Sequence, residues 1–427
     1  MLSIGLMVKS ERDMEFGKQT KMIVAQAEEK LKKQFQEVDE IALVNQARVL
    51  DAFRSNNLGQ RHFAPTNGYG YDDIGRDTLC KVFAELFGTQ SAIVSPLIVS
   101  GTHALSLTLF SLLGRGDKML SVTGSPYDTL QTVINGDNIG SLKDLGVIYR
   151  QVELKNGDFD WENIEKSVDN DTKLVFVGRS RGYEWRDALT VEQIGKVAKL
   201  VKSLNPNTIV MCDNCYGEFI DTFEPTAVGV DVTAGSMIKN IGGGIAPTGG
   251  YVCGRADLIE KISYRLTAPS IGMEVGSYAY GYKDFYQGLF LAPHVVAQAV
   301  KTSLLFGQVF SDVGYNTMPK PCDKCNDIIR SIKFDTEEEL VAFVRSIQEV
   351  SPIDSNVVPY AWDMPGYEDK VIMAAGTFVG GASIELSADS PIKEPYIAYV
   401  QGGLTYEHGK IAVSYCLDKV LKIKATK

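Results

Sequence analysis

The chain has 427 residues, which at roughly 150 residues per domain predicts two or three domains. Hydrophobic residues make up 44% of it and charged residues 22%, a globular balance that excludes a disordered, collagen-like or disulfide-scaffold protein. The net charge of −10 would repel phosphate backbones and anionic lipid, so we expect neither nucleic acid nor a membrane as partner.

The start of the chain carries early charges such as Lys9 and Glu11 and lacks the apolar segment of a secretory signal. Seven scattered cysteines are typical of a reducing compartment. Residues 91–114 contain no charged side chain, but Pro96 and Gly101 interrupt them, which favours a strand, a turn and a helix over a membrane span. We therefore expect a cytoplasmic protein.

The first predicted elements form a helical arm. Residues 14–55 are rich in helix formers, and we assign residues 1–58 to this arm. Residues 62–73 form a loop rich in aromatic side chains. A helix then begins near Arg76 and stops at Gly88.

Strands and helices alternate after this point. The predicted strands are 92–94, 118–122, 147–152, 173–177, 208–212, 233–238 and 250–253. The predicted helices are 102–113, 161–168 and one that Thr190 and Gln193 open with capping-box spacing. This alternation predicts an α/β fold with a mainly parallel sheet, which binds ligands at the carboxyl ends of its strands.

A helical stretch from residue 258 completes a large domain assigned to residues 59–313. A smaller α+β domain is expected at 314–427. Its predicted elements are a loop at 319–327, strands at 328–334, 371–378 and 383–386, and helices at 336–350 and 403–422.

Two segments carry candidate chemistry. Gly101 and Thr102 stand between a strand and a helix, where free backbone N–H groups bind phosphate, although small residues there are also common helix caps. Asp213 ends one buried strand, where it could equally be a turn residue. Lys239 ends another strand before Gly242-Gly243-Gly244, which suits a Schiff-base lysine better than a solvated charge.

Together these features resemble fold-type I pyridoxal-phosphate (PLP) enzymes of cysteine and methionine metabolism. The closest similarity is to the cystathionine β-lyase/methionine γ-lyase-like subfamily named aluminium resistance proteins. The distinctive stretches begin at Asn67 (Asn-Gly-Tyr-Gly-Tyr-Asp-Asp-Ile-Gly-Arg-Asp), Ser180 (Ser-Arg-Gly-Tyr-Glu-Trp-Arg), Gly242 (Gly-Gly-Gly-Ile-Ala-Pro-Thr-Gly-Gly-Tyr) and Glu385 (Glu-Leu-Ser-Ala-Asp-Ser-Pro-Ile-Lys-Glu-Pro-Tyr).

The resemblance implies roles for these residues. Lys239 would hold PLP covalently and then take the substrate α-proton, while Asp213 would pair with the pyridine nitrogen. Gly101, Thr102 and Ser236 would hold the phosphate.

Further roles follow from the same resemblance. Tyr127 would stack on the cofactor ring and protonate the sulfur leaving group, unless it is only a turn residue after Pro126. Tyr71 and Arg76 would reach the phosphate of a neighbouring subunit, although Tyr69 is equally near in sequence.

The chain departs from its relatives in one respect. They bind the substrate carboxylate with an arginine of the small domain, but the last arginine of this chain is Arg345. We expect Arg181, or else Arg179, to replace it, the alternative being surface arginines that pair with Glu184 and Asp187.

The expected function is a PLP-dependent carbon–sulfur lyase that cleaves a cystathionine-, cysteine- or methionine-type amino acid to a keto acid, ammonia and a thiol. We expect a homo-oligomer, a dimer or homotetramer, with its site shared between chains. An aminotransferase, an aldol-type cleavage enzyme and a non-catalytic metal-stress protein remain alternatives. The chain has two C-x-x-C pairs, Cys212/Cys215 and Cys322/Cys325, a spacing that zinc can use. We interpret them as ordinary buried or loop thiols, so no metal site is expected.

Overall fold

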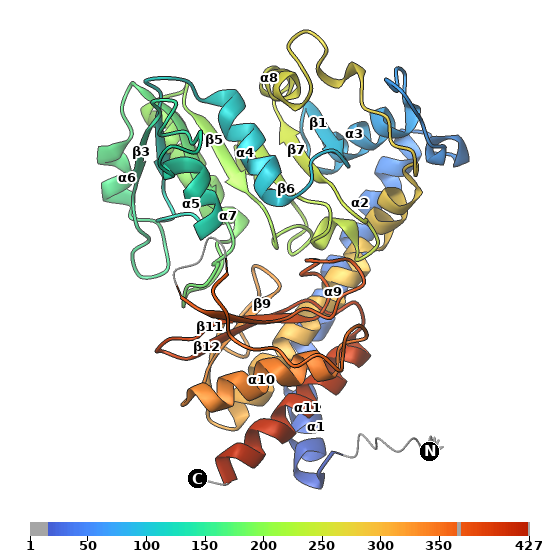
Figure 1. Ribbon diagram of the computed structural model, residues 1–427, viewed down its shortest axis with the longest axis vertical. Helices are drawn as coiled ribbons and strands as arrows, with labels where there is room; N and C mark the ends of the chain where they lie inside the picture. Colours follow the sequence, from blue (N-terminus) through green and yellow to red (C-terminus); the bar gives the residue numbers. More distant parts are fainter. Residues whose placement is uncertain (1–15, 365–368, 426–427) are drawn as a thin grey trace.

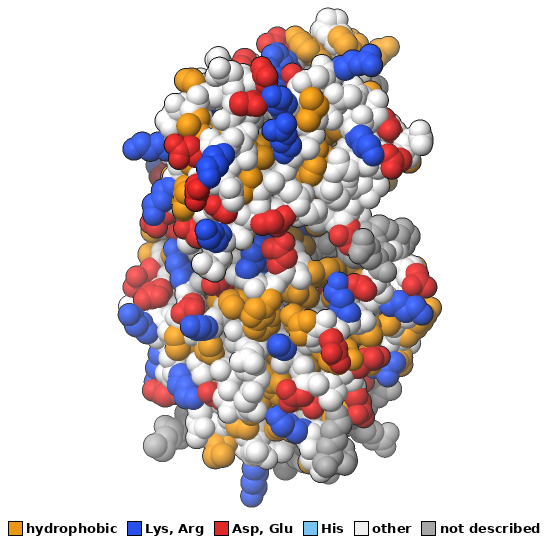
Figure 2. Space-filling model, turned by 90° about the vertical axis from the view of Figure 1, so that its left-hand side faces the viewer, with side chains coloured by type: hydrophobic (Ala, Val, Ile, Leu, Met, Phe, Trp, Pro, Cys, Tyr) orange, Lys and Arg blue, Asp and Glu red, His pale blue; other side chains and the backbone are white. Residues whose placement is uncertain are grey.

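The computed structural model describes residues 16–364 and 369–425. Two lobes are stacked along the long axis, a large one on a seven-stranded sheet and a small one on a five-stranded sheet (Figure 1). Charged side chains of both signs are scattered over the face in Figure 2, and apolar side chains gather in a band across the small lobe.

The sheet of the large lobe has the order β1-β7-β6-β5-β4-β2-β3. Its strands are β1 (Ser91–Ser95), β2 (Lys118–Ser121), β3 (Ile148–Gln151), β4 (Thr172–Gly178), β5 (Ile209–Asp213), β6 (Val232–Ser236) and β7 (Gly250–Gly254). Strands β2 to β6 pair in parallel, whereas β7 runs antiparallel to β1 and β6. The mainly parallel sheet predicted from the alternating pattern is confirmed.

Helices cover both faces of this sheet. They are α3 (Ile74–Leu86), α4 (Gly101–Leu112), α5 (Asp128–Asn135), α6 (Trp161–Ser167), α7 (Val191–Leu204) and α8 (Ala256–Leu266). Short 3-10 turns occupy Gln60–Phe63, Pro225–Val228, Asn240–Gly242 and Gly272–Glu274. Helix α4 contributes Leu105 and Leu109 to one core layer, and α7 contributes Ile194 and Val201 to the other. The capping box at the start of α7 is present as predicted.

Helix α9 (Lys283–Asp312) runs through both lobes and packs against α2 (Lys32–Ser55) (Figure 1). Among the described residues it is the one helix long and apolar enough to cross a membrane, but 72% of its most apolar window is buried inside the protein. Such burial is typical of a core helix. A helix that crossed a membrane would instead leave the side chains that face lipid exposed on the surface of the protein.

The first and last described helices pack together in the small lobe. Helix α1 (Lys18–Lys30) packs against α11 (Tyr406–Ala425) and α9. Thr20 donates a hydrogen bond to Asp418 at 3.2 Å, and Glu28 accepts one from Lys410 at 2.8 Å. Helix α1 is therefore part of the small lobe's helical layer, whereas α2 reaches the large lobe, where Asn45 donates to the Phe219 carbonyl at 3.2 Å. The described part of the predicted N-terminal arm is helical, and residues 1–15 of that arm lie outside the described residues.

The small sheet has the order β10-β11-β12-β9-β8, and every neighbouring pair is antiparallel. Its strands are β8 (Asn316–Met318), β9 (Ile329–Lys333), β10 (Val371–Ala374), β11 (Ser387–Pro391) and β12 (Ile397–Gln401). Helices α10 (Glu337–Glu349) and α11 cover one face, and the other face turns toward the large lobe (Figure 1).

The predicted strand at 383–386 is wrong. These residues form the turn before β11, where the Glu385 carboxylate accepts the backbone N–H groups of Phe378 and Val379 at 2.9 Å each. The strand itself is Ser387–Pro391, a segment with no β-branched side chain. It is extended because β10 and β12 pair with it on both sides, so tertiary pairing overrides local propensity.

Candidate active site

Asp213, Ser236 and Lys239 lie at the carboxyl ends of neighbouring strands. Asp213 is the last residue of β5 and Ser236 the last of β6, with Lys239 three residues further on. The two strands pair in parallel, with Asp213 opposite Ala234. Their ends therefore meet at the edge where parallel sheets bind ligands.

Helix α4 begins at the same edge. Ser100 caps it by accepting the backbone N–H of His103 at 3.0 Å, and the first turn carries no acidic side chain. A Cβ on Gly101 would stand 3.3 Å from both the Cys215 sulfur and the Ser236 Cβ. The positive end of the helix dipole thus points at a small space beside β5 and β6, which is suited to an anion.

Lys239 lies over an aromatic ring. Its Nζ stands 3.9 Å from the centroid of the Tyr216 ring, a cation–π distance. Burial alone would favour the neutral amine. Against this, the polar groups of Cys215 and Tyr216 and the Asp213 carboxylate favour the charged amine, so the pKa of Lys239 lies well above its ordinary value.

Asp213 and Tyr127 share this site. Asp213 Oδ1 accepts the backbone N–H of Cys215 at 3.0 Å, and burial raises its pKa against the opposing charge of Lys239. Tyr127 Oη lies 2.9 Å from Thr102 Oγ1. Burial, and the charge of Asp213 after it, raise the pKa of Tyr127, so the phenol keeps its proton at neutral pH.

A strained turn places the ring beneath Lys239. Tyr216 has φ of 70°, in the left-handed region that non-glycine residues avoid. Arg179 holds this turn, because its Nη1 donates to Asn214 Oδ1 and to the Gly217 carbonyl, each at 2.8 Å. Arg179 is 2% exposed and thus committed to the protein. Its predicted role in binding the substrate carboxylate has no support in this geometry.

Arg181 is also buried, at 1% exposure. Its Nη2 lies 3.1 Å from Asp327 Oδ1, and its Nη1 donates to the Met318 carbonyl at 2.9 Å. These partners come from the small lobe, so Arg181 fastens the two lobes together. We correct our expectation that it clamps a substrate carboxylate. The alternative of a surface pair is wrong for Arg181 as well, although Arg186 does pair with Glu184.

A buried polar layer behind the site was missed from the sequence. Tyr251 Oη donates to Glu218 Oε1 at 2.7 Å, and Asn240 donates to the Glu218 carbonyl at 3.1 Å. A Cβ on Gly235 would stand 2.5 Å from Tyr251 Oη, so this layer packs directly against β6. Burial raises the pKa of Glu218 to about 8.

The small lobe adds polar residues that no motif indicated. Asp389 of β11 accepts a hydrogen bond from Gln401 of β12 at 3.3 Å. Burial raises the pKa of Asp389 to about 6, and the charge of Lys239 partly opposes the rise. An aspartate within Ser387–Pro391 reads as a turn residue in sequence, so no local signal could identify it.

Tyr71 lies in the loop before α3, and Arg76 lies in the first turn of that helix. Arg76 is buried and donates to the carbonyls of Gly70 at 2.9 Å and Gly276 at 3.2 Å. Tyr71 is 63% exposed and packs against the exposed ring of Tyr69. The structure therefore commits Arg76 to its own loop, whereas Tyr71 faces outward.

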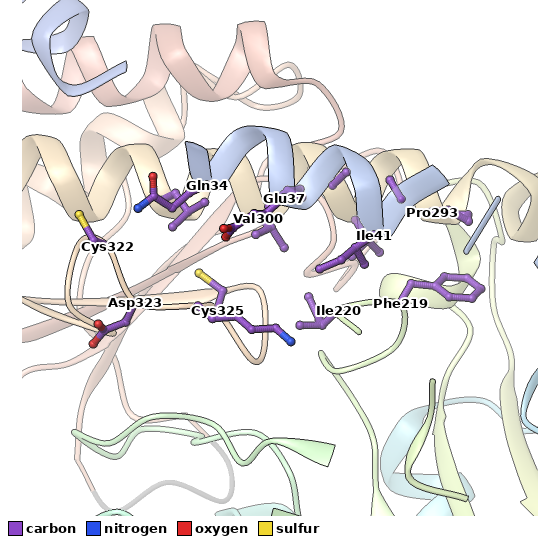
Figure 3. Close-up of a pocket in the computed structure, with 16 residues that line it drawn as sticks. Gln34, Glu37, Ile41, Phe219, Ile220, Pro293, Val300, Cys322, Asp323 and Cys325 are labelled. Carbon is purple, nitrogen blue, oxygen red and sulfur yellow. The ribbon is translucent and has the colours of Figure 1, made fainter. Parts of the chain in front are cut away.

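The two C-x-x-C pairs have separate surroundings. Cys212 and Cys215 are buried. Cys322 and Cys325 lie along a pocket between α2 and α9, where the Cys325 sulfur faces Arg330 at 3.3 Å (Figure 3). Among the described residues, no three histidine, cysteine, aspartate or glutamate side chains are grouped to hold a metal ion.

Comparison with known proteins identifies the family. A family model described as methionine gamma-lyase matches residues 20–421. The chain belongs to the methionine gamma-lyase family. The resemblance proposed from the sequence motifs is thus confirmed.

Relatives of this family member cover nearly its whole length. The uncharacterized protein YnbB of Bacillus subtilis is 47% identical over 90% of this chain and 93% of its own. A structure of a carbon-sulfur lyase involved in aluminum resistance from Clostridium novyi is 48% identical, with a TM-score of 0.91 over 95% of this chain and 96% of its own. The PLP-dependent protein YhfS of Escherichia coli shares the fold, with a TM-score of 0.62 at 16% identity over 90% and 97% of the chains.

The residues of this family member fit PLP. Helix α4 begins with Gly101, and a Cβ at this position would narrow the space in which a phosphate can bind. Lys239 makes no ion pair within the described chain that would occupy its amine, and the buried carboxylate of Asp213 lies close enough for their charges to interact. The aldehyde, ring nitrogen and phosphate of PLP would thus be matched by Lys239, Asp213 and the start of α4.

Proposed function

We propose that the protein is a PLP-dependent carbon–sulfur lyase. It cleaves a sulfur-containing amino acid of the cystathionine, cysteine or methionine type by α,β- or α,γ-elimination, which yields a keto acid, ammonia and a thiol. The observation that carries the proposal is the placement of Lys239 among Asp213, Tyr127 and Tyr216, beside the start of α4.

PLP, when bound, supplies a ring that withdraws the electrons left as the Cα–H bond breaks. Lys239 would hold the cofactor through its amine and, with that amine free, would move the proton at the substrate Cα. Asp213 keeps the ring nitrogen protonated, because a buried carboxylate stabilises a neighbouring positive charge. Gly101, Thr102 and Ser236 bind the phosphate.

Tyr127 donates a proton to the leaving sulfur. A tyrosine phenol is protonated at neutral pH, and the contact of Tyr127 with Thr102 fixes the ring beside the phosphate end of the site. A thiolate that receives this proton leaves as a neutral thiol, which lowers the barrier to breaking the C–S bond.

We also propose a cytoplasmic homo-oligomer, a dimer or a dimer of dimers, whose copies complete one another's sites. Tyr71 is the residue that reaches a neighbouring phosphate site. Two exposed apolar side chains, Leu97 and Val99, lie in the loop between β1 and α4. Their exposure supports a contact between this loop and a second copy of the chain. Arg76 positions the loop that carries Tyr71.

The test uses purified protein loaded with PLP. Borohydride reduction should attach the cofactor to the peptide that contains Lys239, as read by mass spectrometry, and Lys239→Ala should lose this label. Cysteine, cystathionine, methionine and homocysteine are then assayed for keto acid, ammonia and thiol. Dependence on a keto-acid acceptor without thiol release would replace the lyase with an aminotransferase.

A further inference from the structure

One face of the small sheet carries an acidic residue, Asp389, toward the candidate active site. Asp389 of β11 lies directly opposite Tyr399 of β12, and such cross-strand partners project to the same face of a sheet. Tyr399 belongs to an apolar cluster against which Tyr216 packs. Because the Tyr216 ring lies beneath Lys239, Asp389 is on the sheet face that looks into the site.

Loops that adjoin this sheet touch both sides of the lysine loop. Gly381 lies against Ile238, the residue before Lys239, with 3.8 Å between its Cβ position and the Ile238 Cδ1 atom. Leu404, just after β12, packs against Gly244 on the other side of the loop. The wall that carries Asp389 is therefore held next to the reacting amine by packing at two points.

Asp389 has no cation of its own lobe. Gln401 Nε2 donates to it at 3.3 Å, and no ion pair joins it to a lysine or arginine in the part of the chain that the structure describes. Arg345 in α10 is the last arginine of the sequence, and it donates instead to the Pro359 carbonyl. A partly exposed carboxylate in this position attracts a cation from the ligand.

We propose that Asp389 binds an ammonium group at the far end of the substrate, beyond the sulfur atom. The inference rests on the proposed lyase function and names its substrate class, thioether amino acids with a second amino group. An ammonium gains a charge-assisted hydrogen bond in this partly desolvated position. A lone carboxylate at the same end meets like charge and is disfavoured.

Two substrates of matched shape test this preference. S-(2-aminoethyl)cysteine and S-ethylcysteine differ by a terminal amino group. The wild-type holoenzyme should show a kcat/KM about tenfold or more higher for the aminoethyl compound, and Asp389→Asn should bring the ratio close to one. Glu407→Gln, which removes an exposed charge from the same lobe, should keep the wild-type ratio. A wild-type ratio near one, or a ratio that Asp389→Asn leaves intact, overturns the inference.

A binding measurement separates this inference from the proposed function. α-Methyl-lysine and α-methylnorleucine have no α-proton and cannot be eliminated, so calorimetry on the holoenzyme reads affinity alone. Tighter binding of α-methyl-lysine that Asp389→Asn abolishes supports the inference even if no thioether is cleaved, in which case only the lyase proposal fails. Equal affinity for the two compounds, or binding of neither, overturns it. Should Asp389→Asn fail to fold, as judged by near-UV circular dichroism, the wild-type comparison decides alone.

Discussion

Tyr216 illustrates how single residues set the chemistry of this site. Its backbone occupies a strained conformation, which the surrounding contacts of Arg179 with Asn214 and Gly217 maintain. The result is an aromatic face fixed under the amine of Lys239. Such a face stabilises the ammonium form without an ion pair that would compete with a ligand.

Glu218 gives this site a pH-dependent stability. Its pKa is about 8 in the folded protein against an ordinary value of 4.5, so between these values the folded state keeps a proton that the unfolded state has lost. The free energy of unfolding therefore falls as pH rises through this window, by at most about 1.4 kcal/mol per pH unit from this residue. Glu218→Gln should flatten the fall in unfolding temperature between about pH 5 and pH 8.

The matched control for this prediction is Glu407→Gln at an exposed position. It should follow the wild-type profile, because an exposed glutamate keeps its solvation on unfolding. Parallel profiles for wild type and Glu218→Gln would show that Glu218 is already ionised in the folded protein.

Arg181 separates a structural role from a catalytic one. Arg181→Met leaves Asp327 buried without its cation, which should cost about 3–5 kcal/mol of unfolding free energy. Adding Asp327→Asn should recover part of the loss. Urea denaturation measures both variants. Under conditions in which Arg181→Met is still folded, its KM should change little. A large rise in KM with unchanged stability would instead show that Arg181 binds the substrate carboxylate.

Some site residues could be predicted from sequence and others could not, for physical reasons. Asp213 and Lys239 end apolar strands and Gly101 starts a helix, so parallel-sheet geometry alone brings them to one edge. Glu218 and Asp389 carry no such signal, because their burial depends on contacts between segments far apart in the chain.

At the scale of elements, the loop that follows Lys239 packs closely against helix α9. Gly243 has φ of 56° and its Cα faces the Gly288 carbonyl, while Gly288 in turn lies against the Gly242 carbonyl. The turn and the helix approach backbone to backbone, and side chains at either glycine would separate them. The position of the lysine therefore depends on a helix that lies more than 40 residues further along the chain.

Gly288→Ala tests this coupling. The added methyl group would overlap the Gly242 carbonyl, so we expect a loss of about 1–3 kcal/mol in stability and a weaker hold on the cofactor. Unfolding free energy and PLP affinity by fluorescence titration measure these effects. Gly59→Ala, at a position with open space, is the control and should change neither. Unchanged affinity in Gly288→Ala would mean that the loop adjusts independently of α9.

Elements were predictable where local patterns decide them. The capping box at Thr190 and the alternating strands of the large lobe need no distant information. Strand β11 is short and polar, and pairing in the small sheet makes it extended, whereas β12 carries the strand-forming residues Ile397, Tyr399 and Val400. The predicted elements lack β8 and β12 of that sheet and α5 of the large lobe.

The whole molecule is two lobes fastened by buried contacts rather than by a flexible linker. Helix α9 crosses both, and the Arg181–Asp327 pair joins loops on the facing sides. In the proposed assembly, Tyr71 of one copy reaches the phosphate site of another, so a complete site would need two chains. The outer loop that carries Tyr71 is consistent with such an assembly, since two exposed rings lie there side by side.

Mixing defective chains tests the shared site. Tyr71→Ala and Lys239→Ala should each be inactive or strongly impaired alone, by about 10²-fold or more for the lysine variant. After co-refolding, hybrid oligomers should regain activity, because one site combines an intact Lys239 with an intact Tyr71. Activity assays alongside light scattering measure the result. No recovery in hybrids that do form would confine each site to a single chain.

The contact between α1 and α11 has a consequence for how the chain folds during synthesis. The apolar face of α1, with Val24 and Ala27, is shielded by a helix that begins only at Tyr406. Helix α9 also packs against α1 and is made earlier, but the side of α1 that contacts α11 stays uncovered until the chain beyond Tyr406 has been made. A nonsense mutation that removes α11 would thus expose both ends of the small lobe at once, and the truncated product should be a substrate for chaperones and proteases rather than a partly active enzyme.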